Sequence, residues 1–180
     1  MRRGFAVAVL LGLAACAAQS PVLTLTEGFR DPSAQIASQT NVTAARMEGD
    51  WNIRQRFDSA IGPQGSMALT AQPDGTLRWT FESEDCPNNM CETPGGLVVL
   101  TPAGPGRWRP VDPDGAGFDA ELWVMWMDFD DRTVAIGTPD GRFGFIMDKS
   151  ASGGSDRIAA ARDIMDWFGY DIARLESVTH

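Results

Sequence analysis

Histidine and cysteine are the residues best suited to nucleophilic or metal chemistry, and both are scarce in this chain. The only histidine is His180, the last residue, and chain ends are seldom held in place. A Ser-His-Asp or Cys-His site needs an imidazole beside its nucleophile, and a histidine-based zinc site needs one as a ligand. Haem would need an axial ligand, and no motif supports Tyr170 or a methionine in that role. We therefore expect no enzyme activity, no metal and no other cofactor.

Cys16 follows an N-terminal targeting segment. Residues 1–15 have a basic start, a short apolar stretch and the small pair Ala14-Ala15. This is the pattern of a secretory signal peptide, and the stretch is too short to span a bilayer permanently. Leu-Ala-Ala-Cys resembles the lipobox of bacterial lipoproteins, which implies cleavage before Cys16 and fatty acylation of that cysteine. With Ala17 next, the resemblance favours an anchor in the outer membrane; the periplasmic side is favoured over the outer face, which stays open. The alternative is an ordinary signal peptide with an incidental cysteine.

The other two cysteines, Cys86 and Cys91, enclose the polar sequence PNNM. In an exported protein, a close pair in a polar loop predicts a disulfide. Such a short loop would contribute roughly 2 kcal/mol in the chain-entropy model. A redox-active pair is the alternative, although redox motifs usually separate the cysteines by two residues.

The acidic charge of the chain excludes some partners. The 180 residues carry a formal net charge of −9. Removal of residues 1–15 takes away the positive charges of Arg2 and Arg3, so the remaining chain is still more acidic. Such a protein is a poor ligand for nucleic acid or for anionic lipid headgroups, so membrane attachment would depend on the anchor. The cluster Asp128, Asp130 and Asp131 suggests paired acids or a metal site, but a solvated turn is the simpler interpretation.

Turn sequences divide the remainder into short strands. Pro-Asp-Gly occurs at 73–75, 113–115 and 139–141 and predicts tight turns rather than calcium loops, because no spaced series of oxygen ligands surrounds it. Residues 16–45 are predicted to be a lipidated tether and lead-in segment, and 46–180 a single domain. The expected strands are 49–57, 66–72, 76–83, 96–101, 107–111, 121–129, 132–138 and 142–149. A helix between Ser155 and Gly169 and one short extended run follow them.

This order of elements, and the sequences at both ends of the domain, resemble the lipocalin family. GDWNIRQRFD contains the Gly-x-Trp with which lipocalins begin their first strand, and it is similar to bacterial lipocalins in particular. DRTVAIGTPDGRFGFIMDK resembles their last hairpin, and MDWFGYDIARLESV their helix and closing segment. The resemblance implies an all-β fold, an eight-stranded antiparallel up-and-down barrel with a C-terminal α-helix and a short final strand.

The resemblance also assigns a structural role to the Gly-x-Trp motif. In the family the tryptophan ring plugs the closed end of the barrel, and a basic side chain from the last strand lies across it. Gly49, Trp51 and Lys149 occupy the matching positions. A cation–π contact between Lys149 and Trp51 would contribute ~0.5–2 kcal/mol.

Strict alternation along the strands predicts which side chains face the barrel interior. Residues 121–129 are apolar on both faces, and alignment by resemblance places Leu122, Val124 and Trp126 inside and Trp123, Met125 and Met127 outside. Phe57 is expected to face inward. The predicted ligand-binding residues are Ile53, Gln55, Met67, Leu69, Leu77, Trp79, Phe81, Val124, Trp126, Phe143 and Phe145.

An aromatic, methionine-rich lining suits an acyl chain or another apolar molecule. The expected function is therefore that of a lipid-anchored lipocalin that binds or carries a small hydrophobic ligand, of the fatty acid or lysophospholipid class, in the cell envelope. The same large side chains also have the volume to fill a barrel. The alternative is an envelope lipoprotein with a filled barrel that acts through protein–protein contacts, and a weaker third possibility is a lipocalin-type enzyme.

Overall fold

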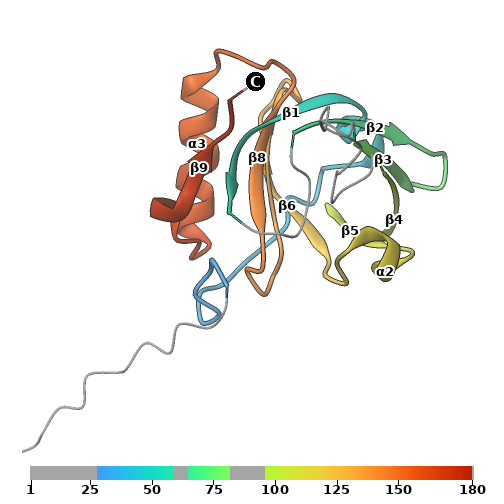
Figure 1. Ribbon diagram of the computed structural model, residues 1–180, viewed down its shortest axis with the longest axis horizontal. Coiled ribbons are helices and arrows are strands. Elements are labelled where there is room, and N and C mark those ends of the chain that lie inside the picture. Colours follow the sequence, from blue (N-terminus) through green and yellow to red (C-terminus); the bar gives the residue numbers. More distant parts are fainter. Residues whose placement is uncertain (1–27, 59–64, 82–95, 180) are drawn as a thin grey trace, which may run out of the picture.

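The computed structural model describes residues 28–58, 65–81 and 96–179, which form a closed antiparallel barrel with one long helix on its outside (Figure 1). Each strand pairs with the next, and β1 pairs with both β2 and β8, which closes the barrel. The predicted eight-stranded up-and-down barrel is confirmed. Its strands are β1 (Gly49–Phe57), β2 (Ser66–Ala71), β3 (Leu77–Phe81), β4 (Leu97–Gly104), β5 (Arg107–Pro110), β6 (Leu122–Met127), β7 (Thr133–Gly137) and β8 (Gly144–Asp148).

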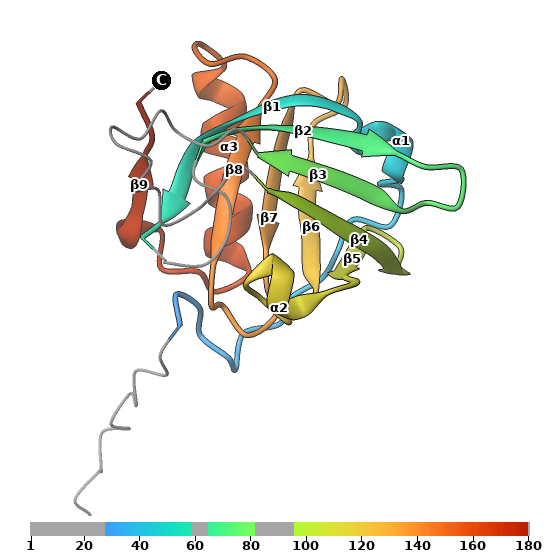
Figure 2. The same ribbon diagram turned by 45° about the vertical axis from the view of Figure 1, so that its right-hand side comes forward.

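The elements outside the barrel include the predicted helix and final strand. The helix is α3 (Ser155–Trp167), and after a 3-10 helix (Ile172–Arg174) the strand β9 (Leu175–Ser177) pairs with the second half of β1. The short helix α1 (Ala44–Met47) lies at the same end of the barrel as the β2–β3 turn (Figure 2). A second short helix, α2 (Pro113–Ala116), replaces the turn predicted for 113–115, because Asp112 caps it by accepting a hydrogen bond from the Gly115 amide.

Three shifts of register interrupt the described barrel strands; one lies between Pro102 and Gly104 of β4, and the other two, in β1 and β6, affect the predicted site residues. In β1, Ile53 pairs with Met147 and Gln55 with Ile146, so Arg54 is an extra residue. In β6 a similar shift of register lies between Val124 and Trp126. An extra residue reverses the alternation of side chains beyond it. The bulge in β1 also marks where the strand stops pairing with β2 and begins to pair with β9.

The buried apolar side chains form two clusters on opposite sides of the sheet. The interior cluster fills the barrel: Val42, Ala44, Met47, Trp51, Ile53, Met67, Leu69, Leu77, Trp79, Val98, Leu100, Trp108, Phe118, Leu122, Val124, Met127, Val134, Ile136, Phe143, Phe145 and Met147. The outer cluster lies on the α3 side: Phe29, Phe57, Met125, Ala135, Ile146, Ile158, Ala161, Met165, Tyr170 and Leu175. Helix α3 contributes Ile158, Ala161 and Met165 at helical spacing, which explains how one face of a short helix covers the barrel.

Part of the predicted tether belongs to the folded domain. Phe29 and Val42 are buried, and the Arg30 guanidinium donates to the Phe168 carbonyl at 2.7 Å and to the Pro139 carbonyl at 2.9 Å. The Gln39 amide donates to the Val124 carbonyl at 2.8 Å. Residues 28–45 of the predicted tether and lead-in segment (16–45) therefore dock on the barrel through a few apolar side chains and these hydrogen bonds.

Three of the predictions fall on residues that the structure does not describe. The signal peptide and Cys16 lie within 1–27, and Cys86 and Cys91 lie within 82–95. Within the described ranges, no helix has both the length and the apolar character needed to cross a membrane.

A buried carboxylate joins α3 to the barrel. Asp148 is fully buried and accepts hydrogen bonds from Thr133 Oγ1 at 2.5 Å, from Arg157 Nη2 at 2.8 Å and from the Ser150 amide at 2.8 Å. Burial by itself would raise the pKa of Asp148, but these donors and the positive charge of Arg157 lower the pKa below its usual value.

Replacement of this carboxylate tests that link. We expect Asp148→Asn to lower the free energy of unfolding by about 2–4 kcal/mol near neutral pH, because Arg157 loses its buried counter-charge. The folded-state pKa of Asp148 lies below the unfolded value of about 3.9, so its contribution is present above about pH 4 and is lost as the pH falls through the folded value. Urea unfolding of both proteins near neutral pH and in acid measures this, and a difference that persists unchanged in acid would contradict it.

Candidate ligand-binding site

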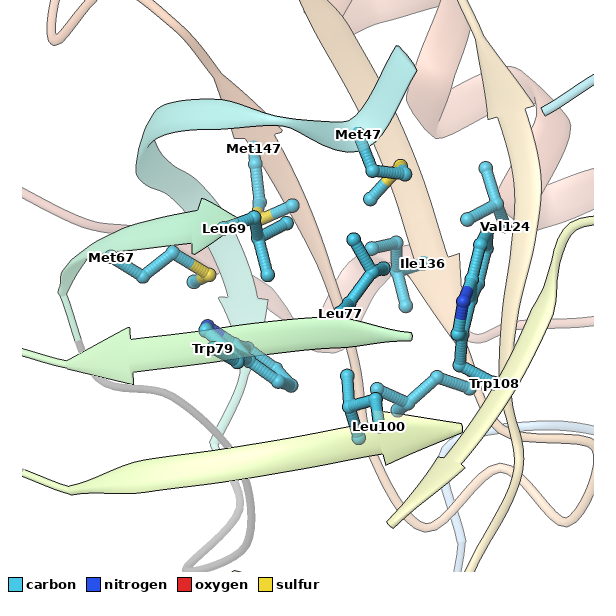
Figure 3. A pocket seen from close by; sticks show the side chains of 11 residues that line it. Met47, Met67, Leu69, Leu77, Trp79, Leu100, Trp108, Val124, Ile136 and Met147 are labelled. Carbon is cyan, nitrogen blue, oxygen red and sulfur yellow. The ribbon is translucent and has the colours of Figure 1, made fainter. Parts of the chain in front are cut away.

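An apolar cavity of about 20 Å³ lies inside the barrel (Figure 3). It is nearer the end that carries α1 and the β2–β3 turn, since Met47 of α1 lines it and a lining tryptophan, Trp108, bonds to Gly75 in that turn. The lining side chains are Met47, Met67, Leu69, Leu77, Trp79, Leu100, Trp108, Leu122, Val124, Ile136 and Met147. Every strand from β2 to β8 contributes to this list, so the cavity is a property of the closed barrel rather than of any one hairpin.

The predicted binding residues fall into three groups. Those that line the cavity are Met67, Leu69, Leu77, Trp79 and Val124. Those that belong to the interior cluster without lining the cavity are Ile53, Phe81, Phe143 and Phe145, of which Phe81 is partly buried. Those that lie on the outside of the barrel are Gln55 and Trp126. Nine of the eleven thus face the interior, and whether they bind a ligand stays a prediction.

The inward assignments of Gln55, Phe57 and Trp126 are wrong. Gln55 accepts a hydrogen bond from Arg162 of α3 at 3.1 Å and donates to Ser177 at 3.2 Å. The Phe57 ring stacks on Phe29 and Tyr170, at centroid distances of 4.8 and 5.6 Å, and Trp126 packs against the outer cluster. All three residues come after a bulge. Counting alternate residues across a bulge assigns the later side chains to the wrong face of the strand.

The bulge in β6 also turns one methionine, Met127, inward, although the prediction placed it outside. Met125 belongs to the outer cluster, as expected, but Met127 belongs to the interior cluster. Leu122 and Val124 precede the bulge and face inward as predicted.

Aromatic rings fill the half of the barrel away from α1. Trp79 lies 4.9 Å from Phe81 and 5.9 Å from Phe145, measured between ring centroids. Phe143 stacks on Phe145 at 6.3 Å, and Phe118, from the β5–β6 connection, meets the edge of Phe143 at 5.3 Å. We call these five residues the aromatic cluster. A molecule that enters from the β3–β4 end must pass them to reach the cavity.

Arg56 is a candidate site residue that sequence reasoning missed. It pairs with Phe145, so the two side chains leave the sheet on the same, interior face. Arg56 is half-buried, and its guanidinium has no ion-pair or hydrogen-bond partner within the described part of the chain. Simple alternation from Trp51 places Arg56 outside, and only the extra residue Arg54 turns it inward. No sequence signal for that bulge was recognised.

The closed end of the barrel has the geometry that the resemblance implies. Trp51 is fully buried, and its Nε1 donates to the Met47 carbonyl at 2.8 Å. Lys149 Nζ lies 5.0 Å from the centroid of the Trp51 ring, so the predicted cation–π contact is present. Gly49 has a φ of +126°, a backbone conformation that other residues rarely adopt, which explains the glycine two residues before the ring.

The three carboxylates of the acidic cluster at the β6–β7 turn bond to nearby residues. Asp128 accepts from the amides of Arg132 and Thr133, both at 2.6 Å, and Asp130 forms an ion pair with Arg132 at 2.7 Å. Asp131 pairs with Arg46. The interpretation as a turn agrees with these contacts, and no group of three metal-binding side chains occurs among the residues described.

Two solved structures that have the lipocalin fold resemble this barrel. The crystal structure of the major allergen Per a 4 from cockroaches is 13% identical with a TM-score of 0.57, and the match covers 83% of this chain and 96% of that one. Apocrustacyanin C1 is 14% identical with a TM-score of 0.58, and the match covers 84% of this chain and 91% of that one. No protein-family model and no curated protein sequence matches the chain. At these identities the likeness shows the fold alone, which is the lipocalin fold.

Proposed function

We propose that this protein binds a small hydrophobic ligand with a single acyl chain, of the fatty acid or lysophospholipid class, inside its barrel. The observation that carries the proposal is the cavity, which is lined by apolar side chains from α1 and from seven strands. A site of this kind favours an acyl chain because burial of apolar surface contributes roughly 25 cal/mol per Å². The fold supports the proposal only by analogy, since one fold hosts many functions.

The size of the cavity requires the lining to move when a ligand enters. At about 20 Å³ it has room for little more than a water molecule, whereas pockets for organic ligands span about 300–1,000 Å³. Three of the lining residues, Met47, Met67 and Met147, have unbranched and flexible side chains that repack readily. We infer that an acyl chain enters by displacing these methionines and the rings of the aromatic cluster.

Arg56 suits the charged end of such a ligand. It lies on the interior face beside Phe145, and its guanidinium has no ion-pair or hydrogen-bond partner among the described residues, so it could donate to a carboxylate or phosphate at this end of the barrel. The acyl chain would then extend past Phe145 toward the cavity. This orientation keeps the charged group out of the cavity, none of whose lining side chains is charged.

This orientation predicts a selective effect of Arg56→Gln. We expect the affinity for dodecanoate to fall about three- to tenfold, the loss for a half-exposed charge-assisted hydrogen bond, and the affinity for methyl dodecanoate to stay unchanged. Arg78→Gln is the matched control, because Arg78 is an exposed arginine on the outer face of β3. Equal losses for the acid and the ester, or an equal loss in the control, would show that Arg56 does not hold the head group.

The proposal is one of binding without turnover and of attachment to the outer membrane. The lone histidine, His180, is the sequence feature that supports the first part, and Leu-Ala-Ala-Cys16 is the feature that supports the second. Growth of the expressing cells with labelled palmitate tests the attachment. Label should appear on the parent chain and be absent from Cys16→Ser, and an unlabelled parent chain would contradict an acyl anchor.

A second candidate function follows from the same small cavity. A barrel whose interior is already filled can serve as a rigid scaffold, with its outer surface as the binding element. In that case the protein is an envelope lipoprotein that acts through protein–protein contacts.

A fluorescence titration separates the two candidates. The protein is stripped of lipid by unfolding and refolding and titrated with fatty acids and lysophospholipids, with Trp79 and Trp108 as reporters because both line the cavity. Saturable binding of about one ligand per chain supports the carrier. A folded protein with no response to any of these ligands contradicts it and favours the filled scaffold.

A further inference from the structure

Within the described residues, the lining of the barrel cavity presents one indole N–H that has no hydrogen-bond acceptor. Two tryptophans line the cavity, and each carries an indole N–H. Trp108 Nε1 donates to the Gly75 carbonyl at 3.0 Å. Trp79 is only 2% exposed, and its buried Nε1 has no hydrogen-bond acceptor among the described residues.

The position of this N–H suits contact with a ligand. Trp79 lies in the middle of β3, lines the cavity and contacts Phe81 and Phe145 of the aromatic cluster. In Figure 3 the nitrogen-bearing edge of its ring lies on the side of Met67, which also lines the cavity. A molecule that displaced Met67 would therefore come against this edge.

The surroundings of Trp79 select the kind of acceptor. An ionised carboxylate needs a cation or several donors to offset the loss of water. None of the side chains that line the cavity is charged, and Trp79 offers a single neutral N–H. A neutral carbonyl oxygen meets one donor at far lower desolvation cost, and it satisfies a group that is otherwise left unpaired.

We propose that Trp79 Nε1 is a specificity-determining donor for a ligand that carries a neutral carbonyl, as in an acyl ester, rather than for a free carboxylate. The inference rests on the proposed ligand-binding function and narrows its ligand class. Within that class it favours lysophospholipids and other esters, whose carbonyl is uncharged, over fatty acids at this point in the barrel. Arg56 remains the partner for a charged head group nearer the rim.

The test compares two ligands on three proteins. Methyl dodecanoate and tridecane have chains of similar length, but only the ester has an acceptor. Their affinities are measured by displacement of the neutral fluorescent probe N-phenylnaphthylamine from the parent protein, from Trp79→Phe and from Trp108→Phe. The ratio of ester to hydrocarbon affinity removes the effect of the volume lost with each indole. Trp108→Phe is the matched control because its N–H is already bonded to Gly75.

We expect Trp79→Phe to lower this ratio about three- to tenfold, the value of one neutral hydrogen bond, and Trp108→Phe to leave it unchanged. In the parent protein the indole N–H resonance of Trp79 should move downfield with the ester and not with the hydrocarbon. If both ligands bind and the ratio is the same in Trp79→Phe, this inference is wrong and the proposed function stands. If neither ligand binds the folded parent protein, the proposed function fails and the inference fails with it.

Discussion

Trp51→Ala is expected to destabilise the protein by about 3–5 kcal/mol, the usual cost of removing a fully buried tryptophan. Trp51 has no exposed surface, its Nε1 bonds to the Met47 carbonyl, and its ring lies under Lys149. The substitution removes all three interactions from the closed end of the barrel. A typical domain is stable by only about 5–15 kcal/mol, so the variant should unfold at much lower urea concentration or at lower temperature.

Two further variants show how much of this loss of stability is specific to the position of Trp51. Trp167→Ala removes the same side chain from an 80% exposed position at the end of α3, and its stability should stay within about 0.5 kcal/mol of the parent. Lys149→Met keeps much of the side-chain length but removes the charge, and it should cost about 0.5–1 kcal/mol. If Trp51→Ala were as stable as Trp167→Ala, Trp51 would not be a structural plug of the barrel.

The strand order of the barrel could be predicted because turns and alternation are local properties. The predicted strands 49–57 and 66–72, for example, correspond to β1 (Gly49–Phe57) and β2 (Ser66–Ala71). Gly, Pro and Asp mark the connections, and each short apolar run between them can bury one face only by pairing with its neighbours. The closed end could be predicted as well, because Gly49 and Trp51 form a motif that does not depend on distant contacts.

The faces of residues beyond the bulges could not be predicted in this way. Arg54 and Met125 are not glycines, and neither residue type identifies an unpaired position in a strand. The bulges depend on how β1 and β6 fit against β8 and β7, which is a tertiary property. Each wrongly assigned side chain therefore results from one bulge. The bulge in β1 that turns Gln55 outward also turns Arg56 inward.

The volume left inside the barrel also lies beyond the reach of a sequence pattern. Alternation assigned Leu77 and Trp79 correctly to the interior, but the same assignment is compatible with a large pocket or with a filled core. A cavity of about 20 Å³ is the small difference between the barrel volume and the summed side-chain volumes, so one rotamer change in Met67 or Met147 alters it substantially. This is why the decisive experiment is one that changes the interior volume.

Leu77→Ala is expected to enlarge the cavity and to create a binding site for small apolar molecules. Leu77 is 1% exposed, lines the cavity and lies near its centre in Figure 3. Its replacement should cost about 2–5 kcal/mol of stability. A cavity left by such a truncation in an apolar core stays dry and accepts benzene or xenon. Calorimetry with benzene should therefore show saturable binding to Leu77→Ala and none to the parent protein.

Leu175→Ala is the matched control for this experiment. Leu175 is also buried, at 7% exposure, but it belongs to the outer cluster. A similar loss of stability with no change in the affinity for acyl ligands is expected. If Leu77→Ala raises the affinity for dodecanoate and Leu175→Ala does not, the cost of displacing interior side chains is what limits binding in the parent protein. If both variants leave that affinity unchanged, the acyl chain does not occupy the interior, and the outer surface of a filled barrel becomes the functional element.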